Sequence, residues 1–117
     1  MKALVVLTAV VLFCASFVAV ASDVPPGKKI FDRHCAACHA AGVGTPGTQL
    51  LGWTRGKEFA LLEERKDLQA DYVRFVVRHG LWEMPPFRPT EIDDVQLGQL
   101  ADYLARPGRR SKRPKLR

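Results

Sequence analysis

The sequence contains few of the residues that cross-link chains or bind metal ions. Among its 117 residues are three cysteines, three histidines and two methionines. Cys14 lies within an apolar run near the start, which leaves Cys35 and Cys38 as the cysteines of the remaining chain. We therefore expect no structural disulfide. A second Cys-x-x-Cys or a His-x3-His pair is also missing, which argues against a structural zinc site. No βαβ pattern surrounds the two cysteines, which argues against a thioredoxin-like redox pair.

The first 21 residues have the pattern of a secretory signal peptide. Lys2 precedes an apolar run over residues 3–20, and the small residues Ala19 and Ala21 stand at the two positions that signal peptidase reads before a cut after Ala21. The mature chain would begin at Ser22, and we expect it in the periplasm. The alternative is an uncleaved membrane anchor, because an apolar run of this length is close to what spans a bilayer.

The sequence CAACH at residues 35–39 is the attachment motif of a c-type haem. On a helical turn the sulfurs of Cys35 and Cys38 lie on neighbouring faces, where each can form a thioether with one vinyl group of the same porphyrin. His39 then directs a ring nitrogen at the iron. A chain of this length forms one small domain, whose core a haem would fill.

The motif is predicted to end a helix. Gly27, Phe31, Cys35 and His39 recur at four-residue intervals, which places them on one stripe of a helix. Ile30 and Phe31 are expected to face the core. The remaining histidine of this region, His34, precedes the first thiol and is expected in solvent rather than on the metal.

The region after the motif is poor in regular patterns. Residues 40–51 contain Gly42, Gly44, Pro46 and Gly47, a composition that predicts a turn rather than a helix or strand. Residues 52–66 indicate a short surface helix, and their apolar side chains, Trp53 among them, could cover a haem.

Two further helices are predicted downstream. The first spans residues 69–78 and stops at Gly80; its three valines also suit a strand, but its capping residues favour a helix. The second spans residues 92–105, with Asp93 as N-cap and Gln96 three residues on, a capping box.

Met84 is the only methionine left once Met1 is removed, and it lies 45 residues after His39. Pro85 and Pro86 follow it and stiffen the backbone by fixing φ. A preset loop of this kind suits a weak thioether ligand, so Met84 is the candidate sixth ligand. Two alternatives remain: Met84 as a core side chain, and His79 as the sixth ligand.

These features together resemble class I c-type cytochromes over residues 26–105. The shared positions are the following: Gly27, Phe31, the motif at 35–39, Met84, Pro85 and the closing residues Asp102, Tyr103 and Leu104. The resemblance implies an all-α fold of three to four helices around one covalent haem c. It also implies that Phe31 and Tyr103 pack where the first and last helices cross, and that the Pro46 carbonyl accepts a hydrogen bond from the His39 ring.

More narrowly, residues 78–92 resemble small periplasmic cytochromes that take electrons from dehydrogenases, including the cytochrome subunits of p-cresol methylhydroxylase-like flavoproteins. The resemblance implies a one-electron carrier rather than an enzyme, with a periplasmic dehydrogenase as donor and another cytochrome or a terminal oxidase as acceptor. The alternative is a haem-based gas sensor or peroxidase in which Met84 is labile. That alternative needs a distal acid–base pair, and His79 is the one histidine near Met84 in the sequence.

The charge of the chain is concentrated at its end. The net charge is +6, but residues 106–117 hold seven basic side chains and no acidic one. Without this tail and Lys2, residues 22–105 have 10 basic against 12 acidic side chains. The tail is expected to be disordered. Weak contact with anionic lipid or an acidic partner fits it, and the alternative is a tail that is simply solvated. An exported chain is not expected to bind nucleic acid.

Overall fold

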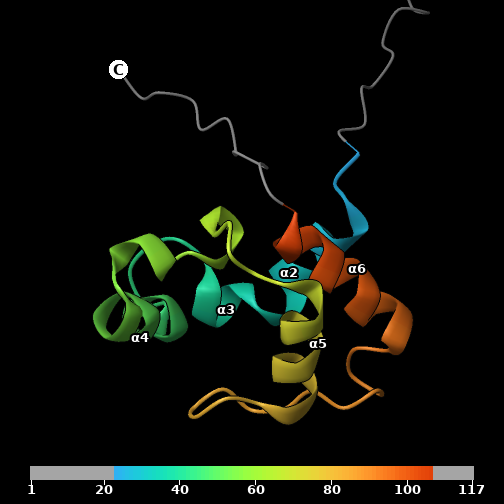
Figure 1. Cartoon of the computed structure of the whole chain (residues 1–117). Helices are drawn as coiled ribbons and strands as arrows, with labels where there is room; N and C mark the ends of the chain where they lie inside the picture. Colours follow the sequence, from blue (N-terminus) through green and yellow to red (C-terminus); the bar gives the residue numbers. More distant parts are fainter. Residues whose placement is uncertain (1–22, 107–117) are drawn as a thin grey trace, which may run out of the picture.

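The structure is a computed structural model that describes residues 23–106. Within this part the chain is helical and has no β-strand, which confirms the predicted all-α class (Figure 1). Its helices are α2 (Pro26–His34), α3 (Ala36–His39), α4 (Pro46–Arg55), α5 (Ala70–His79) and α6 (Asp94–Ala105), with two 3-10 turns, η2 (Lys57–Phe59) and η3 (Leu62–Glu64). The expected signal peptide, and the basic tail beyond Arg106, lie outside the described residues. Among residues 23–106, no helix has the length and apolarity needed to cross a membrane.

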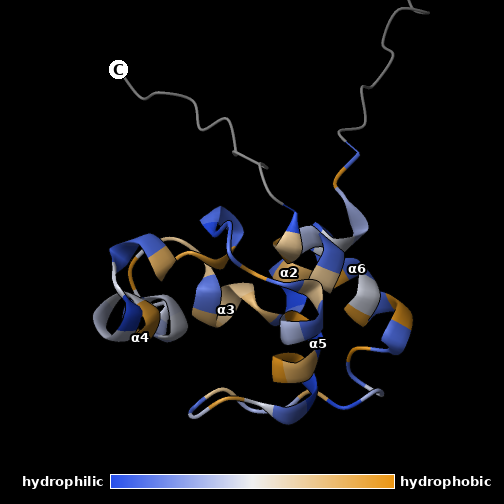
Figure 2. Ribbon diagram, in the orientation of Figure 1, coloured by the Kyte–Doolittle hydropathy of each residue, from blue (hydrophilic) through white to orange (hydrophobic). Residues whose placement is uncertain are grey.

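The core lies where α2, α5 and α6 meet (Figure 1). Hydrophobic residues alternate with hydrophilic ones along these helices (Figure 2). The buried cluster consists of Ile30, Phe31, Cys35, Leu68, Val73, Val77, Ile92, Leu97, Leu100, Ala101 and Leu104. The first cysteine of the motif is therefore part of the core itself.

The crossing of α2 and α6 depends on a glycine. A Cβ atom at Gly27 would overlap the carbonyl oxygen of Gln99 and the Cβ of Tyr103, so the backbones approach closely. Phe31 is 1% exposed, and its ring centroid lies 6.4 Å from that of Tyr103. This confirms the packing that the resemblance implied for Phe31 and Tyr103.

Gly27→Ala is therefore expected to lower the free energy of unfolding by about 1–3 kcal/mol, as overpacking does. Gly98→Ala, within α6, is the matched control, because a Cβ there has no neighbour within 4 Å. It should stabilise the fold by roughly 0.5–1 kcal/mol through helix propensity. Thermal unfolding followed by circular dichroism measures both. Equal effects of the two substitutions would contradict the close approach at Gly27.

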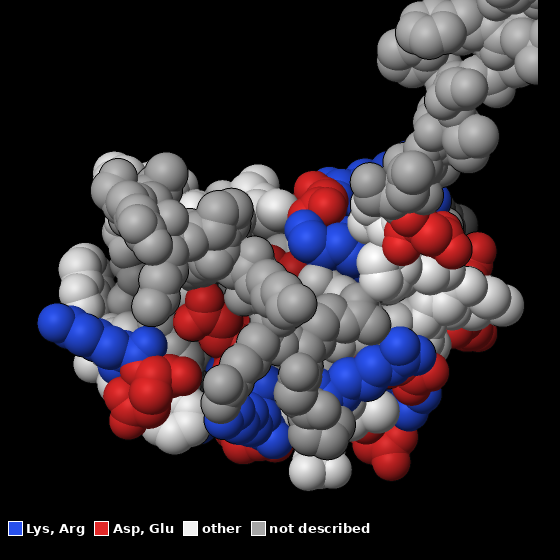
Figure 3. Space-filling view, turned by 90° about the horizontal axis from the view of Figure 1, so that it is seen from above, with Lys and Arg blue, Asp and Glu red and all other residues white. Residues whose placement is uncertain are grey.

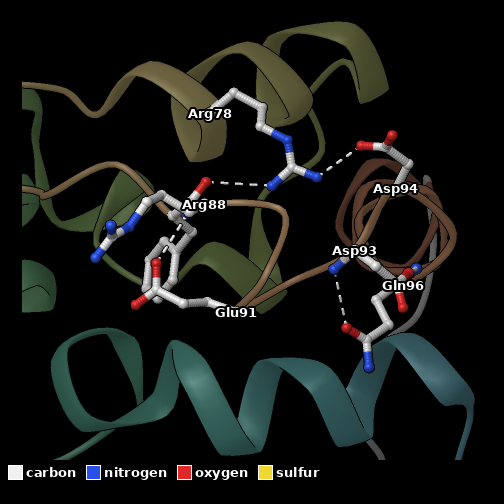
Figure 4. Close-up of polar contacts among 7 residues, drawn as sticks. Arg78, Arg88, Glu91, Asp93, Asp94 and Gln96 are labelled. Carbon is white, nitrogen blue, oxygen red and sulfur yellow. Dashed lines mark hydrogen bonds and ion pairs between the residues drawn. The ribbon is translucent and has the colours of Figure 1, made fainter.

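The downstream helices form as predicted. Helix α5 begins directly after Gln69, Val73 and Val77 are buried, and the helix stops at Gly80, whose φ of 74° suits glycine. At the start of α6, the Asp93 side chain accepts from the Gln96 amide at 2.8 Å, and the Gln96 side chain accepts from the Asp93 amide at 3.1 Å. This is the predicted capping box, part of which Figure 4 shows.

Two predictions for the middle of the chain are corrected. Residues 46–51 are the start of α4 rather than a turn, because Pro46 stands at the first helical position, where its fixed φ favours a helix. The loop is confined to residues 40–45, where Gly42 and Gly44 have positive φ. Residues 57–64 form two 3-10 turns in place of the indicated surface helix.

Candidate functional site

The motif at residues 35–39 lies at the junction of α2 and α3. The helix is interrupted at Cys35, whose φ is −115°, so the single predicted helix is two. The hydrogen-bond register nevertheless continues: the Cys35 amide donates to the Phe31 carbonyl at 2.8 Å, and the His39 amide donates to the Cys35 carbonyl at 2.9 Å. The four-residue stripe is preserved through the break.

The two thiols have different surroundings. Cys35 is 8% exposed and Cys38 is open to solvent, and the two do not form a disulfide with each other. Burial, with a smaller contribution from Cys38, raises the pKa of the Cys35 thiol to about 12. A redox-active Cys-x-x-Cys pair relies on a lowered thiol pKa, so the buried Cys35 does not fit that chemistry.

The His39 imidazole is half-buried, and burial lowers its pKa, which favours the neutral form that ligates metals. Its Nδ1 atom is buried and has no hydrogen-bond partner among the described residues. The hydrogen bond that the resemblance implied to the Pro46 carbonyl is therefore not formed. As the first residue of α4, Pro46 has its carbonyl directed along the helix axis. A buried, unpaired ring nitrogen is costly, and such atoms are a mark of functional sites.

Helix α4 packs directly on the His39 ring. A Cβ at Gly47 would lie 2.7 Å from Cε1 and 2.9 Å from Nδ1 of His39. The Thr48 hydroxyl donates to the Ala40 carbonyl at 2.9 Å, and the Thr45 hydroxyl donates to the Gly42 carbonyl at the same distance. The start of α4 is thus fastened to the chain that leaves the motif. This role of Gly47 was not predicted from the sequence, because it depends on the His39 ring that lies against it.

Met84 closes a tight turn with Leu81. The Leu81 amide donates to the Met84 carbonyl at 3.0 Å, and the Met84 amide donates to the Leu81 carbonyl at 2.9 Å. Trp82 has a φ of 52°, which gives a turn with positive φ at its first central position, as in type II′. Met84 is half-buried and packs against the same core cluster that contains Cys35. The two backbone hydrogen bonds of the turn and the packing on the core cluster therefore fix the position of Met84 relative to the core.

The other two histidines have partners outside the motif. His79 is exposed, its Nδ1 lies 2.9 Å from the Phe75 carbonyl, and its ring stacks on the Phe75 ring at 4.4 Å. His34 packs edge-on against Phe87, with centroids 6.1 Å apart. Both contacts hold the imidazole against neighbouring protein groups.

The surface around these elements carries charges of both signs. Figure 3 shows Lys and Arg interspersed with Asp and Glu over one face. Trp82, 71% exposed, lies under the Arg55 guanidinium at 6.0 Å from its ring centroid. This contact joins the end of α4 to the Met84 turn, so an aromatic ring and a cation stand together on the surface.

The arrangement suits a covalently held haem. The Cys35 and Cys38 thiols and the His39 imidazole lie at the junction of α2 and α3. The Met84 side chain lies on a turn that two prolines follow, and it packs against the core cluster that contains Cys35. Between residues 23 and 106, no group of three or more His, Cys, Asp or Glu side chains is placed to hold a metal ion. Fold and donor set together define a small helical haem domain.

Comparison with known proteins places the chain within that class. The family described as cytochrome c oxidase, cbb3-type, subunit III matches residues 22–104. The chain is 33% identical over 79 residues to the cytochrome c subunit of 4-cresol dehydrogenase (hydroxylating) from Pseudomonas putida, covering 68% of this chain and 58% of that subunit. It is 35% identical over 83 residues to cytochrome c6 from Leptolyngbya boryana, covering 71% of this chain and 91% of that protein. No solved structure gives a significant match.

The chain belongs to this cytochrome c family. Its cofactor is a covalently bound haem c, and it is a haem-based electron carrier with redox proteins as partners. The haem supplies reversible one-electron oxidation and reduction. The protein contributes position, burial and a docking surface.

Proposed function

We propose that the chain is a periplasmic one-electron carrier in which Cys35 and Cys38 form the two thioethers to haem c and His39 and Met84 are the axial ligands. The observation that carries this proposal is that Met84 packs against the core cluster that contains Cys35, although the two residues are 49 positions apart in the sequence. The fold therefore brings the attachment motif and the methionine turn to the same apolar interior, where a porphyrin would be shielded from water.

Met84 is the better candidate for the sixth ligand than His79. Its turn is closed by two backbone hydrogen bonds, and its side chain packs on the core. The His79 ring, in contrast, is exposed and stacks on the exposed Phe75 ring of its own helix. Methionine opposite histidine also raises the reduction potential, which favours acceptance of electrons.

We propose a periplasmic dehydrogenase as the donor. The support is the similarity to the Pseudomonas putida subunit, together with the predicted signal peptide over residues 1–21. The acceptor would be another cytochrome or a terminal oxidase. The basic tail gives a further weak attraction to an acidic partner or to anionic lipid.

The test combines electron transfer with ligand binding. The oxidised protein is mixed in a stopped-flow instrument with a reduced dehydrogenase encoded beside its gene, and carbon monoxide is added separately to the reduced protein. We expect fast single-phase reduction and no carbon monoxide complex, because both axial positions are filled. A rapidly formed complex, or steady turnover of peroxide, would instead establish the sensor or peroxidase alternative.

A further inference from the structure

The chain that carries Met84 is anchored at both of its ends to α5. At its start, the Gly80 amide donates to the Val76 carbonyl at 2.7 Å, and the turn from Leu81 to Met84 follows. A Cβ at Gly80 would lie 2.6 Å from the Met84 carbonyl oxygen, so this end is tightly packed. The position of Met84 on the entry side is thus fixed by backbone contacts alone.

The residues that follow Met84 can donate fewer backbone hydrogen bonds than those that precede it. Pro85 and Pro86 have no amide hydrogen, so Phe87 is the first residue after Met84 that can donate a backbone hydrogen bond. Its amide donates to the Val77 carbonyl at 2.8 Å. Its carbonyl accepts a hydrogen bond from Nη1 of Arg78 at 3.2 Å. Both backbone groups of Phe87 are therefore held by consecutive residues of α5.

Arg78 also reaches the last helix. Its Nη2 atom donates to Asp94, the first residue of α6, at 2.7 Å (Figure 4). One guanidinium therefore connects α6 with the methionine segment, residues 81–87. The Arg78 side chain is 19% exposed and that of Asp94 is 90% exposed. The contact with the Phe87 carbonyl is thus the more shielded of the two, and the ion pair with Asp94 is largely screened by water.

Phe87 transmits this anchoring to the attachment motif. Its ring packs edge-on against His34, the last residue of α2 and the neighbour of Cys35. Phe87 also packs against the core cluster. Moving Phe87 would therefore shift the methionine segment relative to the helix that ends at the motif.

We infer that Arg78 is the positioning residue that keeps Met84 bound as the sixth ligand. This inference rests on the proposed His39 and Met84 ligation. A thioether is a weak ligand, so a small displacement of its turn lets an external ligand replace it. Arg78 holds the exit of the turn by a charge-assisted hydrogen bond, of the kind whose loss costs more than that of a neutral one.

The test measures how readily an external ligand displaces Met84. Imidazole is titrated into the oxidised holoprotein and followed by its visible spectrum, for the unmutated chain, Arg78→Met and Arg74→Met. Arg74 is the matched control, because it lies one turn earlier on α5 and pairs with Asp71 and with Asp102 of α6. Its ion pairs within residues 23–106 do not involve the methionine segment. We expect Arg78→Met to bind imidazole about tenfold more tightly and to lose part of the far-red sulfur-to-iron band. Arg74→Met should change the affinity by less than about twofold.

Two more variants show how much of the effect of Arg78 on imidazole affinity comes from its contact with the Phe87 carbonyl and how much from its contact with Asp94. Asp94→Asn should resemble Arg74→Met, since only the screened contact is weakened. Arg78→Lys should lie between Arg78→Met and the unmutated protein, because one ammonium can reach the carbonyl but cannot span both partners. If Arg78→Met does not fold, Arg78→Lys compared with Arg74→Lys gives the same ordering.

The outcomes separate this inference from the proposed ligation. If the far-red band depends on Met84 but Arg78→Met and Arg74→Met bind imidazole equally, the positioning role is wrong and the ligation stands. If the band does not change in Met84→Leu, the ligation is wrong and the inference falls with it.

Discussion

Met84→Ala is expected to abolish the far-red band of the oxidised protein and to let carbon monoxide bind the reduced form. The thioether is the proposed sixth ligand, and alanine has no group that reaches the iron. The reduction potential should fall by on the order of 0.1 V, a fraction of the roughly 0.8 V range that axial ligands span. Visible spectroscopy and a redox titration measure these changes.

Met84→Leu tests the same residue with little loss of volume. Leucine keeps the apolar packing against the core and removes only the sulfur, so the cost in stability should stay below about 1.5 kcal/mol. The spectral changes should nevertheless equal those of Met84→Ala. A lower free energy of unfolding with an unaltered spectrum would make Met84 an ordinary core side chain.

His79→Ala is the control for the competing ligand. His79 contacts Phe75 on its own helix, so its removal should leave the far-red band and the carbon monoxide response as they are. Loss of the band in His79→Ala, with the band retained in Met84→Leu, would assign the sixth position to His79.

The parts of the fold that the sequence predicted are those set by local signals. The Asp93 and Gln96 capping box and the stop at Gly80 each depend on a few neighbouring residues, and both have the predicted form. The valine spacing of α5 also places Val73 and Val77 in the core. Such signals need no knowledge of distant contacts.

The start of α4 could not be predicted in this way. Pro46, Gly47 and Gly52 lower the helix propensity of residues 46–55, and in isolation they favour a turn. The helix forms because Pro46 occupies its first position, and because Thr45 and Thr48 fasten it to the loop after the motif. Pro46 and hydrogen bonds to the loop that directly precedes the helix therefore outweigh the low helix propensity of the glycines.

The same limit applied to the site. The motif at residues 35–39 and Met84 are visible in the sequence because their residue types are rare and chemically specific. The residues that position the motif and Met84 cannot be recognised in the sequence. Arg78 is one of 18 basic side chains, and its contact with Phe87 is seen only in the structure. Gly47 acquires its meaning only from the ring that lies against it.

Gly47→Ala is expected to weaken the hold of the protein on the His39 imidazole. The new methyl group would lie 2.7 Å from Cε1 and 2.9 Å from the Cys38 carbonyl oxygen. Because Thr48 ties the start of α4 to the Ala40 carbonyl, the helix cannot simply withdraw, and the ring must move. The overpacking should cost about 1–3 kcal/mol of unfolding free energy.

Gly52→Ala on the same helix is the matched control for this prediction, since its Cβ would be 3.4 Å from that of Ala60 and clear of the site. Helix propensity alone would stabilise both variants by roughly 0.5–1 kcal/mol, so an opposite sign in Gly47→Ala isolates the contact with the ring. Thermal unfolding of the holoprotein gives the two free energies. The visible spectrum should show a disturbed iron environment in Gly47→Ala alone. If the two variants are stabilised equally and keep the same spectrum, α4 does not hold the His39 ring, and the orientation of the proposed proximal ligand must be set by the motif itself.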